Sequence, residues 1–303
     1  MTNYYKIINN TIEYNENIEL TEEFINVCVE NKIISINFCS FFNKSIDLLK
    51  KLDDLEIVWL GKDFNQKIDK LPKNLETLIV GDKFNQQVNY LPAKLSTLKL
   101  GYHFNHPINN LPQSLNTLMV GFRFNQPIDN LPQRLTKLIL GYDFNQLIDK
   151  LPNSLQSLVL GFDFNQSIDN LPHSLKELEI EGEFNQPIDN LPGTLNNLRI
   201  SGKFNQSVDN LPATLQTLNV GIDFDQPIDN LPHTLTKLIL GYEFNHHIDN
   251  LPETLNELQI IGRFNQPVEK LPMTLHTLKI VPAFTQSIKN LPASLCVVEI
   301  GYN

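Results

Sequence analysis

The chain has 303 residues, of which 41% are apolar and 19% are charged, and its net charge is −10. It therefore contains enough apolar residues for a buried core, and its acidic balance argues against a protein that binds nucleic acid, which needs basic surface. No apolar run approaches the roughly 18 residues that cross a bilayer, so we expect no membrane partner. The three cysteines, Cys28, Cys39 and Cys296, are too few for a disulfide framework and fit a reducing compartment.

The first 32 residues do not follow the pattern of the rest of the chain and predict an N-terminal cap. Residues 6–8 and 11–14 flank a pair of asparagines, as in a short β-hairpin. Thr21 is a suitable N-cap residue, and the two glutamates after it favour the first turn of a helix that ends near residue 30. We therefore divide the chain into a cap, residues 1–32, and a repeat domain, residues 33–303.

Residues 61–300 consist of twelve copies of the 20-residue unit G-x-x-F-N-Q-P-I-D-N-L-P-x-x-L-x-x-L-x-[LIV], and a looser copy begins at about residue 42. Apolar residues alternate with other residues near the end of each unit, which is typical of a short half-buried strand, and glycine then ends the strand. The return path of roughly 15 residues is too long for a tight hairpin, and its recurring Leu-Pro excludes a long helix. Parallel strands stacked about 4.8 Å apart would bury the six apolar positions that one unit cannot bury alone.

The repeated phrase L-P-x-x-L-x-x-L-x-[LIV] resembles the strand-forming half of a leucine-rich repeat. The segment Phe124–Pro132, which reads F-N-Q-P-I-D-N-L-P, resembles the FNIP repeat, known chiefly from social amoebae and from giant viruses that infect them. The resemblance implies a mainly-β, right-handed solenoid of 20-residue coils, with a parallel sheet on the concave face and little helix outside the cap. The few cysteines and the lack of a signal-peptide pattern predict a cytoplasmic protein, in the cytoplasm of a host cell if the source is viral.

Two columns of the repeat are predicted to form ladders inside the solenoid. The phenylalanine column would stack as an aromatic spine, and the asparagine column would satisfy backbone groups in the turn after each strand. Two sequons, beginning at Asn165 and Asn205, lie in the asparagine column, so glycosylation would break the ladder. Representative members of the two ladders are Phe124, Phe144, Phe164, Asn125, Asn145 and Asn165.

The aspartate column places seven carboxylates one coil apart, from Asp129 to Asp249. These side chains either repel one another and bind cations, or they form Asx-type turns before each Leu-Pro. Calcium sites use several oxygen ligands for each ion, whereas each unit offers one aspartate. The turn is therefore the favoured interpretation, and we expect no metal site.

Outward-facing strand positions, free of the core, are the candidate binding surface. Ile57 and Trp59, with the equivalent residues of later copies, begin two of these columns, and the position after the glycine forms a third. Contiguous exposed apolar surface indicates a partner site, although the aromatic residues of the third column could also serve only to pack on one another. The glycine shifts to Gly182 and then to Gly202, so we expect the strip to end near residue 170 and a charged zone with Glu177, Glu179, Glu181 and Arg199 to follow. The candidate contact residues are Trp59, Ile79, Lys99, Met119, Ile139, Val159, Tyr102, Phe122, Tyr142 and Phe162.

No motif for catalysis or cofactor binding is present: the sequence has no H-E-x-x-H, no C-x-x-C and no phosphate-binding glycine loop. We therefore expect a non-enzymatic scaffold that binds a protein partner through the concave face, without a cofactor. An alternative is a structural or assembly component, for example of a virion, that self-associates through the C-terminal strand edge near Val298 and Tyr302. A second alternative is a ubiquitin-ligase substrate adaptor, as the resemblance implies for relatives with an F-box, but residues 1–32 show no F-box motif.

Overall fold

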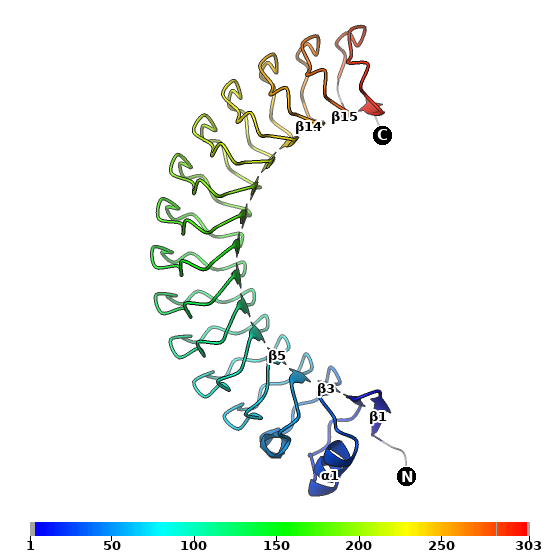
Figure 1. Cartoon of the computed structure of the whole chain (residues 1–303), viewed down its shortest axis with the longest axis vertical. Helices are drawn as coiled ribbons and strands as arrows, with labels where there is room; N and C mark the ends of the chain where they lie inside the picture. Colours follow the sequence, from blue (N-terminus) through cyan, green and yellow to red (C-terminus); the bar gives the residue numbers. More distant parts are fainter. Residues whose placement is uncertain (1–3, 283, 302–303) are drawn as a thin grey trace. The chain divides into compact units, whose positions relative to one another are not determined.

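The structure, a computed structural model, describes residues 4–282 and 284–301. It contains two compact units: the first runs to residue 146 and includes 150–155, and the second includes 147–149 and continues from residue 156. Within each unit, every 20-residue coil contributes one short strand to a parallel sheet and returns through a loop (Figure 1). The predicted mainly-β solenoid of leucine-rich-repeat type is thus confirmed, with α1 as the one α-helix in the described part of the chain.

The first unit begins with a hairpin and a helix. Strand β1 (Tyr5–Ile8) pairs antiparallel with β2 (Thr11–Tyr14), and Asn9 takes the left-handed conformation in the turn, with φ of 49°. Helix α1 (Glu22–Glu30) starts after Thr21, whose side chain accepts a hydrogen bond of 3.2 Å from the backbone N–H of Phe24. This cap satisfies one of the free N–H groups of the first helical turn.

All later strands are parallel and follow chain order within each unit. Strand β3 (Ser35–Phe38) pairs with β2, and a short 3₁₀ helix, η1 (Asp47–Lys51), precedes β4. The remaining strands of the first unit are β4 (Ile57–Trp59), β5 (Thr77–Ile79), β6 (Thr97–Lys99), β7 (Thr117–Met119) and β8 (Lys137–Ile139). The strands of the second unit are β9 (Ser157–Leu160), β10 (Glu177–Ile180), β11 (Asn197–Ile200), β12 (Thr217–Val220), β13 (Lys237–Leu240), β14 (Glu257–Gly262), β15 (Thr277–Pro282) and β16 (Val297–Ile300).

The 20-residue period sets the sheet register directly. Thr77 lies opposite Thr97, and Glu177 lies opposite Asn197, so equivalent repeat positions form straight columns across the strands. Alternate strand residues point into the core: Leu78 and Leu178 are almost fully buried, whereas Ile79 and Glu179 are only half-buried. The side-chain face that carries Ile79 and Glu179 is called the open sheet face below.

The phenylalanine column lies in the core. Phe184, Phe204 and Phe224 are fully buried, and the two ring-to-ring centroid distances between them are both 6.1 Å, with nearly parallel planes. Neighbouring strands lie only about 4.8 Å apart, so adjacent coils are further apart at this column than at the sheet. The rings therefore fill the core mainly by apolar burial rather than by face-to-face contact.

The asparagine column links each coil to the next. The Oδ1 atom of Asn65 accepts hydrogen bonds from the backbone N–H of Asn85, at 2.9 Å, and from Nε2 of Gln86, at 3.1 Å. The same pair of bonds recurs from coil to coil in both units. Where aspartate replaces asparagine at residue 225, its Oδ1 still accepts the N–H of Asn245, at 3.2 Å. The column thus provides acceptors for backbone N–H groups in the turns of successive coils.

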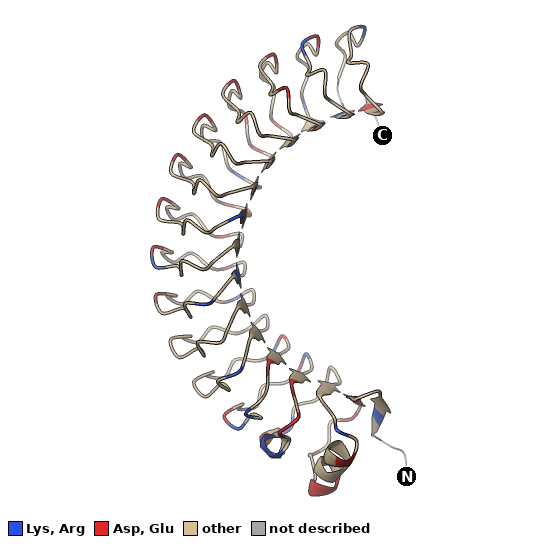
Figure 2. Cartoon of the chain, viewed as in Figure 1, with Lys and Arg blue, Asp and Glu red and all other residues tan. Residues whose placement is uncertain are grey.

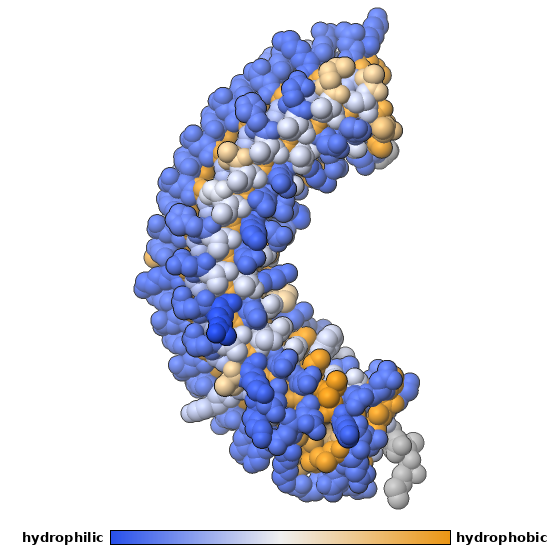
Figure 3. Space-filling view, viewed as in Figure 1, coloured by the Kyte–Doolittle hydropathy of each residue, from blue (hydrophilic) through white to orange (hydrophobic). Residues whose placement is uncertain are grey.

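The last described coil ends with β16, which pairs in parallel with β15. Its side chains Val297 and Val298 are about half exposed, as is Ile288 on the loop before it. In Figure 3, apolar side chains gather near α1 and over the last coils, whereas most of the visible surface between them is hydrophilic. Pairing of β16 with another chain stays a prediction, and Tyr302 lies outside the described residues.

Candidate functional site

The predicted contact residues on the strands lie on the open sheet face, and the aromatic residues of the third column follow the strand ends. In the first unit, Trp59 is the most accessible of them, at 50%, and Tyr102 and Tyr142 are 36% and 37% exposed. Lys99 is also exposed, whereas four further residues are half-buried: Ile79, Met119, Ile139 and Phe122. Val159 and Phe162 belong to the second unit and are half-buried there. We call the exposed and half-buried members in the first unit the apolar strip.

The aromatic residues of the third column stack on one another. The ring centroids of Tyr102 and Phe122 are 4.6 Å apart, and those of Phe122 and Tyr142 are 4.3 Å apart, with interplanar angles of 13° and 10°. The guanidinium of Arg123 lies 6.0 Å from the Tyr102 ring centroid and pairs with Asp143 at 3.6 Å. Because the two tyrosines remain more than a third exposed, the column is both a packing ladder and an accessible surface.

Trp59 extends the apolar strip toward the cap. It lies opposite Asn37 on one side and Ile79 on the other. The Oδ1 atom of Asn37 is buried and has no hydrogen-bond partner in the described part of the chain. Trp59 is thus a large aromatic ring with half of its surface exposed, between two less exposed neighbours.

The aromatic column stops at Phe162, as the shifted glycine predicts. Gly182 has φ of +74°, and a Cβ atom at this position would lie 2.5 Å from the Phe162 ring. The ring therefore lies against a residue that has no side chain, and no aromatic residue continues the stack at that coil. A second, shorter run follows with Ile222 and Tyr242, where the guanidinium of Arg263 lies 5.1 Å from the tyrosine ring centroid.

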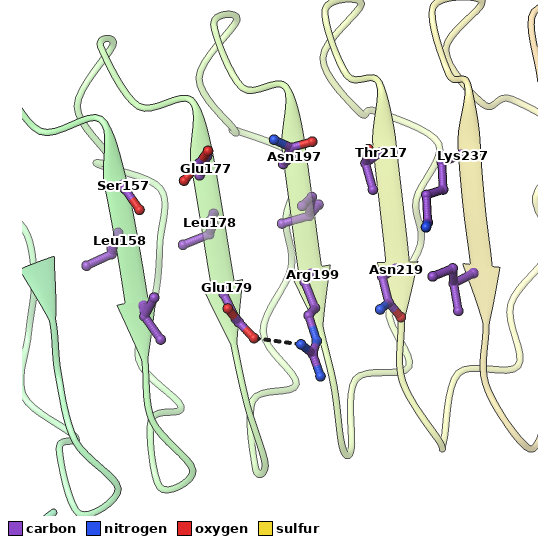
Figure 4. Close-up of a pocket in the computed structure, with 13 residues that line it drawn as sticks. Ser157, Leu158, Glu177, Leu178, Glu179, Asn197, Arg199, Thr217, Asn219 and Lys237 are labelled. Atoms are coloured by element: carbon purple, nitrogen blue, oxygen red, sulfur yellow. Dashed lines mark ion pairs between the residues drawn. The ribbon is translucent and has the colours of Figure 1, made fainter. Parts of the chain in front are cut away.

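A groove replaces the apolar strip on the second unit. It has a volume of about 360 Å³ and crosses strands β9 to β13 on the open sheet face (Figure 4). The shifted glycine and the charged strand residues predicted a charged zone here, but the sequence held no signal for a cavity. The lining side chains on the open face are Ser157, Val159, Glu177, Glu179, Asn197, Arg199, Thr217, Asn219, Lys237 and Ile239.

The charges in the groove are unevenly paired. Glu179 and Arg199, which face each other on β10 and β11, form an ion pair of 2.9 Å (Figure 4). Lys237 forms an ion pair of 3.1 Å with Glu257, on the strand beyond the groove. Glu177 is exposed and has no ionic partner among the described residues. The sequence showed where these charged residues lie in the repeat, but it did not show which of them form ion pairs.

The aspartate column lies on loops away from the strands, where acidic residues recur from coil to coil (Figure 2). Asn190 donates a side-chain hydrogen bond of 3.1 Å to Oδ1 of Asp169, and this bond, together with one from Ser167, lowers the pKa of the Asp169 carboxyl. Five such asparagine-to-aspartate bonds join successive coils of the second unit. These bonds join one coil to the next, which the Asx turn expected within a single coil did not include. The Asp-Asn pair that recurs every twenty residues was the signal for them in the sequence.

No group of three or more histidine, cysteine or acidic residues in the described ranges is arranged to hold a metal ion. Over the same ranges, no helix is both long enough and apolar enough to cross a membrane.

Comparison with known families agrees with the repeat pattern. The FNIP Repeat model matches residues 64–103, 124–163, 144–183, 164–203, 204–243 and 224–263, which together cover more than half of the chain. The chain belongs to the FNIP-repeat family. A search of curated proteins found no match to it.

Among solved structures, the chain is similar to CroV588, a giant-virus protein with a circular leucine-rich-repeat structure, at 33% identity and a TM-score of 0.70. The match covers 96% of this chain and 53% of CroV588, so this FNIP-repeat chain spans about half the length of that protein. An internalin, InlF of Listeria monocytogenes, is 17% identical with a TM-score of 0.58, over 95% of this chain and 86% of its own. YopM of Yersinia enterocolitica is 19% identical with a TM-score of 0.50, over 88% and 70%. The last two likenesses show the fold alone.

Proposed function

We propose that this FNIP-repeat chain is a non-enzymatic scaffold that binds a protein partner through the open sheet face. The observation that carries the proposal is the apolar strip, in which Trp59, Tyr102 and Tyr142 are each more than a third exposed. Partly exposed aromatic residues are typical of interface hot spots, because they bury a large area with few rotatable bonds.

The surroundings of the strip also suit protein binding. Thr77, Thr97 and Thr117 form a half-buried column beside it, and Lys99 provides one charge within it. Short polar side chains lose little entropy when a partner covers them, and a polar rim around an apolar centre is the usual anatomy of an interface. Solenoids of stacked repeats offer such extended surfaces to partners in general. The assembly and ubiquitin-adaptor roles stay predictions, since nothing in the described residues favours them over binding at the strip.

The strip is tested by affinity capture with a matched control. We expect the immobilised wild-type chain to retain a partner from amoeba lysate, because the resemblance implies an amoebal host. Trp59→Ala should weaken this binding by about 30-fold, which corresponds to loss of a hot-spot side chain worth about 2 kcal/mol. Tyr90→Ala removes an aromatic ring that is 70% exposed on a loop, and it should retain full capture. Equal capture by wild type and Trp59→Ala would contradict the proposal, provided that both variants melt at the wild-type temperature.

A further inference from the structure

The groove on β9 to β13 differs in chemistry from the apolar strip and lies entirely within the second unit. Its walls include Val159 at one end and Ile239 at the other, and its centre is polar. The groove is therefore complementary to a ligand that is polar in its middle and apolar at both ends.

Strand β10 carries an excess of negative charge. The side chains of Glu177 and Glu179 lie on the same face of β10. Glu181 follows the strand, continues its alternation of exposed and buried residues, and is exposed. Arg199 neutralises only Glu179. Neither Glu177 nor Glu181 has an ionic partner in the described part of the chain, and Lys176, the nearest basic residue in sequence, does not line the groove. Two carboxylates thus remain available to a cation, and the Glu177 carboxylate lies in the groove itself.

The groove also offers free hydrogen-bonding groups. The side-chain amides of Asn197 and Asn219 line it and make no hydrogen bond within residues 4–282 and 284–301. An asparagine amide offers two donors and one acceptor, which match the alternating N–H and C=O groups of an extended peptide. Figure 4 shows both side chains on the same face of the sheet as Glu177.

We propose that this groove binds an extended, basic peptide segment of a protein partner. A lysine or arginine side chain of that segment pairs with Glu177, its backbone bonds to Asn197 and Asn219, and apolar side chains beside it contact Val159 and Ile239. Charge complementarity selects this occupant over an acidic segment, which the unpaired carboxylate of Glu177 would repel. The inference rests on the proposed protein-binding function and deepens it by naming the chemistry of one partner segment.

The test uses a defined peptide and the full chain. A fluorescein-labelled hexapeptide of alternating alanine and lysine is titrated with protein at physiological ionic strength, and binding is followed by fluorescence anisotropy. We expect saturable binding that weakens about five-fold in Glu177→Gln, because an exposed charge pair is worth about 1 kcal/mol or less. Acetylation of the peptide lysines removes their charge and keeps the aliphatic part of the side chain, and it should reduce binding at least as much.

The matched control separates this site from the general attraction of a basic peptide to an acidic protein. Glu30→Gln removes the same charge from the exposed end of α1, and it should bind like the wild type. Equal weakening in both variants, unchanged binding in Glu177→Gln, or equal affinity for an alanine-glutamate peptide would each overturn the proposal. Lysate capture by Trp59→Ala tests only the apolar strip, and the peptide titration tests only the groove. Either proposal can therefore fail while the other stands.

Discussion

At the residue scale, the cap contains two ionisable side chains buried in the core of the first unit. Cys28 on α1 is 1% exposed, and Tyr14 on β2 is fully buried against Phe24, with ring centroids 5.1 Å apart. Burial raises the pKa of the Cys28 thiol to about 12 and also raises the pKa of Tyr14, because a charged form would lose its hydration. Both side chains therefore stay neutral in the folded state near neutral pH. Cys28 packs as an apolar group, and the Tyr14 hydroxyl donates a hydrogen bond of 3.4 Å to the carbonyl oxygen of Ile18.

This burial predicts a loss of stability in alkaline solution. The unfolded chain releases the Cys28 proton near the ordinary thiol pKa of about 8.5, whereas the folded chain retains it to about pH 12. The stability that the protonated Cys28 thiol contributes is thus fully present below pH 8.5. As pH rises above that value, the free energy of unfolding falls by at most about 1.4 kcal/mol per pH unit for this group. Urea unfolding at several pH values between 7 and 10.5 gives the free energy of unfolding as a function of pH. This free energy should fall less steeply with pH in Cys28→Ala than in the wild type, although the variant is less stable at pH 7. Cys296→Ala, at an exposed position, should keep the wild-type slope, and parallel curves for all three proteins would contradict the assignment.

At the element scale, the turn after each strand depends on its neighbour. The Oδ1 atom of Asn205 accepts hydrogen bonds from the backbone N–H of Asp225 and from Nε2 of Gln226, both at 3.0 Å. The same turns bring backbones very close together: a Cβ atom on Gly202, whose φ is +82°, would lie 2.0 Å from the carbonyl oxygen of Gly182. The asparagine acceptor and the glycine, which has no Cβ atom to collide with the neighbouring backbone, thus both allow one coil to stack on the next.

Asn205→Ala should destabilise the chain by about 1 kcal/mol, because the exposed backbone N–H of Asp225 and the partly buried side-chain amide of Gln226 both lose their acceptor. Asn205→Asp should cost less, since Asp225 naturally accepts the N–H of Asn245 in the next coil. Thermal and urea unfolding of the three proteins measure the difference. Equal losses in the two variants would show that the amide nitrogen, rather than the Oδ1 acceptor, supports the turn.

At the scale of the whole molecule, stability is a sum of contacts between adjacent coils. The ring of Phe204 stacks only between those of Phe184 and Phe224 in the described structure. Nothing in such an array transmits a defect directly to distant coils, so local opening is expected to precede global unfolding.

Phe204→Ala should therefore cost about 3–5 kcal/mol, as for other buried aromatic residues, with a localised effect. Amide hydrogen exchange should accelerate in β10, β11 and β12 and stay unchanged in β4 to β7. Ile222→Ala, at a side chain that is 60% exposed, should change neither exchange nor melting temperature by much. Uniform acceleration along the chain would show that the whole array unfolds as one cooperative body.

The sequence by itself determined the coil, the parallel register and the core, because each is a property of one unit repeated at a fixed period. The period-2 alternation around Leu78 predicted a strand, the 20-residue spacing placed Thr77 opposite Thr97, and the shift of glycine to Gly182 predicted the end of the aromatic column. No distance between atoms of different coils was needed for these predictions.

Only the tertiary structure decided which side chains of adjacent coils meet. It joined Asn190 to Asp169, which lies 21 residues earlier, and it stacked Phe122 on Tyr142 at 4.3 Å while the spine rings stay 6.1 Å apart. It also paired Arg199 with Glu179 and left Glu177 free in the groove. Hydrogen bonds and ion pairs depend on a few tenths of an ångström between side chains, and a one-dimensional pattern of residue types does not contain those distances.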